Sequence, residues 1–146
     1  MNDSTRESQQ ALAAVERVQR LYAAQRAACL AQPYPSADER VARLKALKRQ
    51  TQRWQDLLAE AMSADFGFRP AAESKMLDLL GSVLEAHHAI AHVRRWMKPS
   101  RRSTELLFLG NRLKVTYQPK GVVGVIVPWN FPIYLAMGPL VTALAA

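Results

Sequence analysis

Residues 121–132, with the sequence GVVGVIVPWNFP, decide the fold of this chain. The first part of the stretch, residues 121–127, carries no charge and consists of β-branched residues and glycine. Such a run is typical of a strand that is buried on both faces of a parallel sheet, with helices above and below it. The stretch therefore predicts an α/β fold.

Two prolines mark the end of this strand and the start of the next element. Pro128 cannot donate to a strand ladder, and Pro132 suits the first turn of a helix. We therefore expect the strand to end near Val127, a helix to begin near Pro132, and residues 129–131 to form the turn between them. In open α/β sheets, ligands bind beyond the carboxyl ends of the strands, so this turn is the predicted site.

Residues 127–132, VPWNFP, together with the following IYLAMGPLVTALAA, resemble the aldehyde dehydrogenase superfamily. The WMKP sequence at residues 96–99 is similar to the end of a long helix in the class-3-like branch of that family. The resemblance implies N-terminal helices, a β-hairpin, and then the first strand and helix of a Rossmann-like coenzyme domain. It also implies NAD(P)-dependent oxidation of an aldehyde, here coniferyl or another aromatic aldehyde, to the carboxylic acid through a cysteine thioester.

The same resemblance assigns roles to residues of the turn. Asn130 matches the residue whose side-chain NH2 group donates to the aldehyde oxygen as it becomes an oxyanion. An amide suits this role because it donates without titrating. The residues that would line the adenosine side of NAD or NADP are Ile126, Val127, Pro128 and Trp129.

Plainer interpretations of two of these residues stay open. An asparagine in a turn often bonds nearby backbone, and a tryptophan beside a buried strand often belongs to the core. The motif favours the catalytic interpretation of Asn130. It supports the coenzyme-binding interpretation of Trp129 less strongly. The chain contains no GxGxxG sequence, so it lacks the usual dinucleotide fingerprint.

The resemblance places the nucleophilic cysteine, the general-base glutamate and the glycine-rich coenzyme loop in later segments. The single cysteine of this chain is Cys29. Its spacing from Val15, Val18 and Tyr22 places it on one stripe of a helix, which predicts a buried core thiol. We therefore expect residues 1–146 to be the N-terminal part of an aldehyde dehydrogenase coenzyme-binding domain, inactive by itself.

Residues 1–99 are predicted to be helical in three segments. The first runs over about 5–31, and the second opens with a capping box in which Ser36 is followed by Glu39. The third runs over about 72–97. Its predicted apolar stripe is Met76, Leu80, Val83, His87 and Ile90, which would make His87 a core histidine.

Residues 103–118 predict a β-hairpin, and residues 121–146 the motif strand with its helix. In the hairpin, strands at 106–109 and 113–117 would flank the turn at Gly110 and Asn111. The family resemblance makes this hairpin an oligomerisation element and implies a homodimer. The alternative is a hairpin that pairs only within its own subunit.

The net charge of +8 favours an alternative function, a basic helical module that binds nucleic acid. No recognised binding motif accompanies the charge, so we expect no nucleic acid as a partner. The family resemblance instead implies a small-molecule aldehyde substrate. Residues 121–146 are uncharged and exceed the about 20 residues of a membrane span. Three prolines and an amide, Pro128, Pro132, Pro139 and Asn130, argue against a membrane anchor, because they would leave polar backbone groups unsatisfied in lipid.

Metal binding and localisation are predicted from smaller signals. Glu85, His88 and His92 share one helical face, but no second cluster of ligands accompanies them, so we predict a solvated face and no metal site. The single cysteine fits a reducing compartment. The polar N-terminus lacks the apolar region of a secretory signal, which predicts a cytoplasmic protein.

Overall fold

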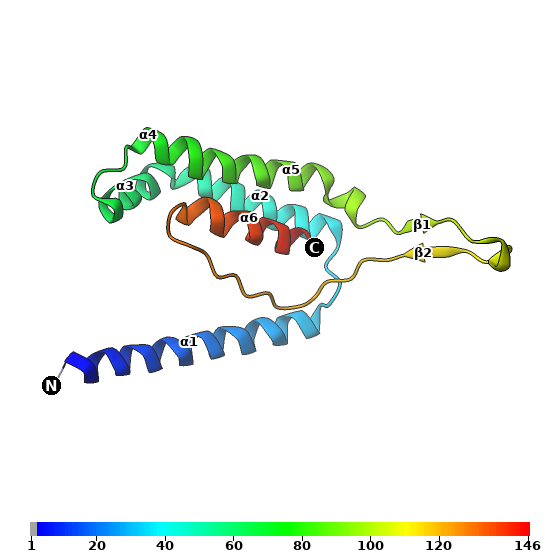
Figure 1. Cartoon of the computed structure of the whole chain (residues 1–146), viewed down its shortest axis with the longest axis horizontal. Helices are drawn as coiled ribbons and strands as arrows, with labels where there is room; N and C mark the ends of the chain where they lie inside the picture. Colours follow the sequence, from blue (N-terminus) through cyan, green and yellow to red (C-terminus); the bar gives the residue numbers. More distant parts are fainter. Residues whose placement is uncertain (1–2) are drawn as a thin grey trace. The chain divides into compact units, whose positions relative to one another are not determined.

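The computed structural model describes residues 3–146, which divide into two compact units (Figure 1). The first unit comprises helix α1 (Asp3–Ala31) and the segment Pro119–Val123. The second comprises Pro35–Gln118 and Gly124–Ala146. Its elements are α2 (Ala37–Arg53), α3 (Gln55–Phe66), α4 (Ala71–Glu73), a π-helical segment η1 (Ser74–Leu80), α5 (Gly81–Trp96), β1 (Ser100–Arg102), a 3-10 helix η2 (Leu106–Phe108), β2 (Leu113–Val115) and α6 (Pro132–Ala145).

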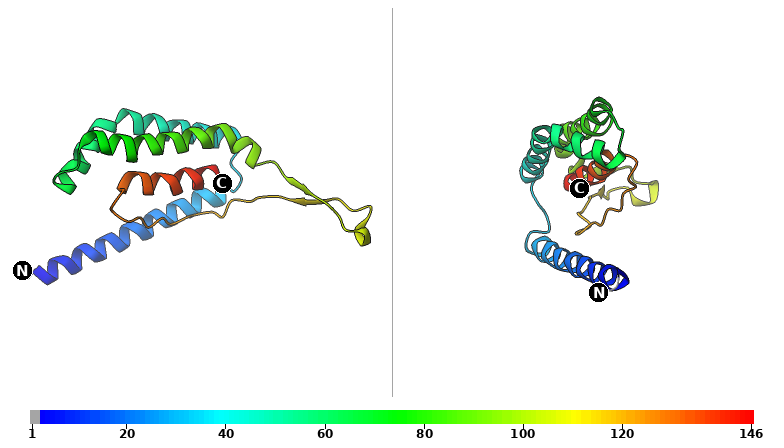
Figure 2. Two further views of the ribbon diagram at one scale, coloured as in Figure 1. Left: turned by 45° about the horizontal axis from the view of Figure 1, so that its top comes forward. Right: turned by 90° about the vertical axis from the view of Figure 1, so that its left-hand side faces the viewer.

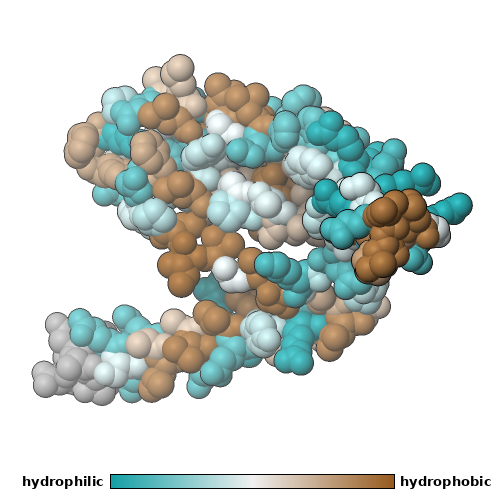
Figure 3. Space-filling view, turned by 45° about the vertical axis from the view of Figure 1, so that its right-hand side comes forward, coloured by the Kyte–Doolittle hydropathy of each residue, from teal (hydrophilic) through white to brown (hydrophobic). Residues whose placement is uncertain are grey.

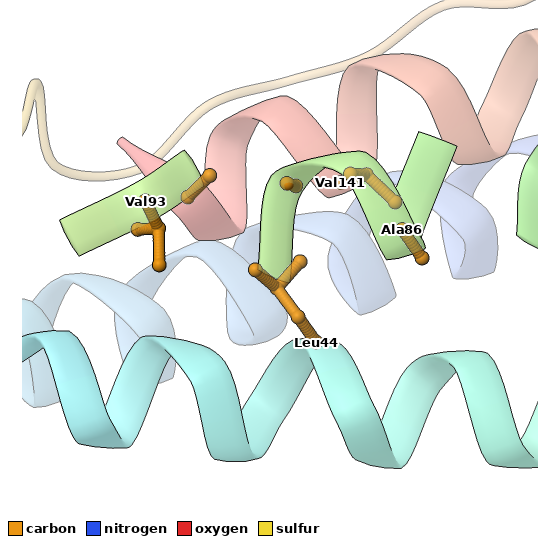
Figure 4. Packing of buried hydrophobic residues seen from close by; sticks show 6 residues of the cluster. Leu44, Ala86, Val93 and Val141 are labelled. Atoms are coloured by element: carbon orange, nitrogen blue, oxygen red, sulfur yellow. The ribbon is translucent and has the colours of Figure 1, made fainter. Parts of the chain in front are cut away.

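The core of the second unit lies between α2, α5 and α6, which run side by side (Figures 1 and 2). Four side chains that are at most 1% exposed meet there, namely Leu44 of α2, Ala86 and Val93 of α5, and Val141 of α6 (Figure 4). Burial of such side chains is the main favourable term in folding. It fixes α6, and with it the turn that precedes α6, against the other two helices.

The predicted starts of two helices are confirmed. Ser36 is the N-cap of α2, and its hydroxyl oxygen accepts from the backbone N–H of Glu39 at 3.2 Å. The Glu39 carboxylate in turn accepts from the Ser36 backbone N–H at 2.7 Å, so the capping box is complete. Helix α6 begins at Pro132, where the missing N–H of proline costs nothing.

The third predicted helix is present, but its buried face differs from the prediction. Met76, Leu80 and His87 of the predicted stripe are exposed, whereas Asp78 and Ser82 are fully buried. A π-helical segment, η1, lies within this stretch, and α5 buries Ser82, Ala86, Ala89 and Val93 instead of the predicted stripe. The prediction of a core histidine is therefore wrong.

The hairpin is also confirmed only in part. Strand β2 lies within the predicted 113–117, but it pairs antiparallel with β1, in the register Ser100 to Val115 and Arg102 to Leu113. The predicted strand at 106–109 instead forms η2, because local hydrogen bonds such as Phe108 N–H to the Glu105 carbonyl replace a ladder there. Gly110 has a φ of 98°, as a turn at this position requires.

The predicted strand at 121–127 does not form in the structure. These residues run as unpaired chain, and Ile126 is fully exposed. Within residues 3–146, the one sheet is the antiparallel pair of β1 and β2, so no parallel neighbour supplies hydrogen bonds to this stretch. The Rossmann-like part of the predicted α/β fold is therefore not seen, and the described fold is mostly helical.

Cys29 is not the buried core thiol that its spacing predicts. It is half-buried, and Val15, Val18 and Tyr22 are exposed along α1. Within the first unit, Cys29 lines a cavity of about 320 Å³ that Gly121 also borders. In the described part of the chain, no helix is both long enough and apolar enough to cross a membrane.

Two leucines test whether the interface between α2 and α5 dominates stability. Leu44→Ala should lower the free energy of unfolding by about 2–5 kcal/mol, because it leaves a cavity in the core. Leu84→Ala, at an exposed position of α5, should change it by less than about 0.5 kcal/mol. Urea unfolding followed by circular dichroism measures both, and equal losses would contradict this placement of the core.

Candidate functional site

Asn130 lies in the turn that leads into α6, and its side chain is exposed. Within residues 3–146, the Asn130 side chain makes no hydrogen bond. The backbone carbonyl of Asn130 accepts a hydrogen bond from Arg69. The structure therefore does not show the local side-chain bond of an ordinary turn asparagine. The amide is left available to a ligand.

The residues predicted to face the coenzyme precede Asn130 directly. Ile126, Pro128 and Trp129 are exposed, and Val127 is half-buried. The core interpretation of Trp129 is wrong for this structure, since 64% of its surface is accessible. These apolar side chains are exposed, and their backbone is not paired with a strand. Such side chains are suited to contact the flat face of an adenine ring.

The N-terminus of α6 is capped from a distance by a buried carboxylate. Its N-cap residue, Phe131, makes no side-chain cap. Instead, Oδ1 of Asp78 accepts from the backbone N–H groups of Ile133 at 3.1 Å and Tyr134 at 2.9 Å. A carboxylate here satisfies two otherwise unpaired donors and lies at the positive end of the helix dipole.

Arg69 joins this carboxylate to the turn. One guanidinium nitrogen donates to Oδ2 of Asp78 at 2.8 Å, and another donates to the backbone carbonyl of Asn130 at 3.3 Å. The Arg69 side chain is 5% exposed and that of Asp78 is fully buried. The guanidinium carbon also lies 5.1 Å from the ring centroid of Phe66 and 5.0 Å from that of Phe131, within cation–π range.

The π-helical segment η1 positions Asp78 for this contact. The Ser82 hydroxyl donates to the Asp78 carbonyl at 2.6 Å. The next turn begins with Gly81, where a Cβ atom would lie 2.9 Å from the ring of Tyr134. The missing side chain therefore lets the first turn of α6 approach η1 closely. Ile133, the residue before Tyr134, packs against a small hydrophobic cluster that contains Leu79.

A second buried cation lies at the other end of α6. Arg40 donates to the backbone carbonyl of Ala145 at 2.8 Å and to that of Pro35 at 3.1 Å. Burial, with a smaller effect from the charge of Arg43, lowers the pKa of Arg40 below its usual value. An arginine nevertheless stays charged, so it complements the negative end of the helix dipole.

The sequence singled out Asn130 as a candidate, which stays a prediction, but it did not single out Arg69, Asp78 or Arg40. A signal for Asp78 was present, because this acidic residue stands among leucines in a stretch that the apolar pattern predicted to be packed. For Arg69 no such signal exists. The predicted face of Glu85, His88 and His92 carries stacked rings of His88 and His92, with centroids 4.0 Å apart.

Comparison with known proteins places the chain among aldehyde dehydrogenases. The sequence model described as "aldehyde dehydrogenase family" matches residues 3–146. The chain is 46% identical over 138 residues to a probable coniferyl aldehyde dehydrogenase of Pseudomonas aeruginosa, covering 94% of this chain and 29% of that protein. It is 36% identical over 110 residues to aldehyde dehydrogenase family 3 member B1 of Bos taurus, covering 75% and 23%.

A third relative agrees with these two. The chain is 39% identical over 125 residues to a probable coniferyl aldehyde dehydrogenase of Caulobacter vibrioides, covering 84% of this chain and 26% of that protein. This chain therefore spans less than a third of the length of the three relatives.

Gly81 tests the close approach of α6 to η1. Its φ of −54° is helical, so alanine fits the backbone. Gly81→Ala should lower the free energy of unfolding by about 1–3 kcal/mol, because the new Cβ meets the Tyr134 ring. In a Tyr134→Ala background the same change should raise it by up to about 1 kcal/mol through helix propensity. Thermal unfolding measures both, and the same sign in both backgrounds would contradict the close contact.

Proposed function

Because the chain belongs to the aldehyde dehydrogenase family, we propose that it supplies the oxyanion-binding asparagine for NAD(P)-dependent oxidation of an aldehyde to the carboxylic acid. The observation that carries the proposal is the exposed, unbonded amide of Asn130 on a backbone that buried charges hold. A donor that is fixed before the reaction stabilises developing charge without reorganising.

The proposed role of Asn130 is confined to one step. When a cysteine thiolate adds to the aldehyde carbon, the carbonyl oxygen becomes an oxyanion, and the Asn130 NH2 group donates to it. NAD(P), which residues 126–129 would hold, would supply the acceptor for the hydride of the same carbon, giving a thioester that water would then hydrolyse. Asn130 keeps its proton throughout, because an amide does not titrate in this range.

Residues 126–129 would bind the adenosine side of NAD or NADP. The exposed apolar surface of Ile126 and Trp129 fits this group, since adenine is flat and largely apolar on its faces. Pro128 restricts the backbone between them. Residues 126–129 carry no acidic or basic side chain of the kind that distinguishes NAD from NADP at the ribose.

The substrate we propose is coniferyl aldehyde or another aromatic aldehyde. The support is the name of two similar proteins, each of which is called a probable coniferyl aldehyde dehydrogenase. The family resemblance places the nucleophilic cysteine after Asn130, and no cysteine follows Asn130 in this sequence. We therefore propose that residues 1–146 alone do not oxidise the aldehyde. Because this chain spans less than a third of the similar proteins, we propose that the activity belongs to a longer, cytoplasmic enzyme.

The hairpin is the proposed dimer contact of that enzyme. Its loop exposes four consecutive apolar residues, 106–109, of which Leu106 and Leu107 are more than 80% accessible. In Figure 3 a hydrophobic cluster surrounded by hydrophilic side chains faces the viewer on the side where Figure 1 places the hairpin. Apolar patches of this kind on a protruding element mark interaction surfaces.

Asn130→Ala tests the proposed chemistry in the enzyme that contains this chain. It should lower kcat for aldehyde oxidation by about 10²- to 10³-fold, the typical effect of losing one oxyanion donor. Reduction of the coenzyme, followed spectrophotometrically, is the readout. Gln52→Ala, at an exposed amide of α2 that lies outside both the turn and the hairpin, is the matched control and should leave kcat unchanged. A near-wild-type kcat for Asn130→Ala would show that the amide plays no part.

Leu107→Asp tests the hairpin as a dimer contact. The new carboxylate would be buried without a partner, so the dimer dissociation constant should rise by at least about 10-fold. Leu30→Asp, at an exposed leucine of α1, is the control and should leave the dissociation constant unchanged. Analytical ultracentrifugation of the enzyme that contains this chain measures both. Unaltered association of Leu107→Asp would place the dimer contact elsewhere.

A further inference from the structure

We infer that Arg69 and Asp78 are positioning residues, which hold the Asn130 amide where an oxyanion forms. The inference rests on the proposed role of Asn130 and extends it to two residues that no motif of the family resemblance includes. Neither side chain reaches the exposed turn surface, since Arg69 is 5% exposed and Asp78 is fully buried. Both therefore act on the reaction only through the backbone that they hold.

The pair constrains the backbone on the C-terminal side of Asn130 at successive points. Arg69 donates to the Asn130 carbonyl, which limits rotation of the peptide that follows the Asn130 Cα atom. Its guanidinium also lies against the ring of Phe131, the next residue. Asp78 then accepts from the N–H groups of Ile133 and Tyr134. The Cα–Cβ direction of Asn130 is set by this backbone.

The two residues act as one unit, because each oxygen of the Asp78 carboxylate has a separate task. Oδ1 accepts from backbone N–H groups at the N-terminus of α6. Oδ2 accepts from Arg69, which also donates to the Asn130 carbonyl. Hydrogen bonds to charged groups are roughly twice as strong as neutral ones, and burial strengthens them further. A displacement of either side chain therefore moves both the turn and the start of α6.

The guanidinium is needed for its shape as well as its charge. It contacts Asp78 and the Asn130 carbonyl through different nitrogens, and it lies within cation–π range of the rings of Phe66 and Phe131. Lysine has a single nitrogen and no planar face, so Arg69→Lys keeps the charge and loses this geometry. A displacement of about 1 Å can cost up to about 10²-fold in rate.

A double-mutant cycle in the enzyme that contains this chain separates positioning from general damage. Arg69→Lys should lower kcat, measured per titrated active site, by about 10- to 100-fold with the asparagine present. In an Asn130→Ala background the same substitution should lower kcat by less than about 2-fold, because the donor it positions is already gone. Equal losses in the two backgrounds would overturn the inference.

Hydrogen exchange provides a readout that does not depend on activity. Asp78→Asn removes the charge that holds the Ile133 and Tyr134 amides, so their exchange should become at least about 10-fold faster. Arg69→Lys is the milder variant and should also speed their exchange. Asp56→Asn, in the exposed ion pair with Lys75, is the matched control and should leave it unchanged. Unaltered exchange at these amides in both variants would overturn the inference.

The two experiments also distinguish failure of the inference from failure of the proposed function. If Asn130→Ala leaves kcat unchanged, the proposed oxyanion role is wrong, and the inference, which depends on it, falls with it. If Asn130→Ala is impaired while Arg69→Lys retains full kcat, the proposed function stands and the inference alone is overturned.

Discussion

The buried ion pair between Arg69 and Asp78 is the constraint on which the arrangement of this chain depends. Through it, residues that precede α5 hold the turn at Asn130 and the first turn of α6, more than fifty positions later in the sequence. Without it, the N-terminus of α6 would present unpaired N–H groups beside a buried guanidinium. The pair is stable because backbone groups of the turn and of α6 provide further hydrogen bonds to both partners.

Helix α6 is uncharged and mostly apolar, so apolar packing alone would fix which face is buried more firmly than the position of the helix along its axis. Buried charges remove this freedom. Asp78 lies at the N-terminus and Arg40 at the C-terminus, each with the sign that complements the helix dipole. A helix held at both ends cannot slide without breaking charge-assisted bonds, which gives the preceding turn a defined position.

The candidate residue Asn130 could be singled out from the sequence, whereas the side chains that hold its turn could not. Asn130 could be found because a short motif surrounds it, and motif recognition needs only neighbouring residues. Arg69 and Asp78 could not be found as a pair, because their contact and the burial of Asp78 within a π-helical segment depend on the tertiary fold. The strand predicted at 106–109 does not form, for a related reason. Local turns compete with strand pairing wherever the sequence spacing does not specify the partner strand.

By itself, the sequence determined the features that depend on neighbouring residues: the capping box at Ser36, the start of α6 at Pro132, and the turn that carries Asn130. Only the tertiary structure decided which face of 74–96 is buried, which segment pairs with β2, and which charges hold α6. The physical reason is that these depend on contacts between residues far apart in the chain. The mostly exposed, unpaired stretch 121–127 shows the same rule, because a buried strand forms only where neighbouring strands complete its hydrogen bonds.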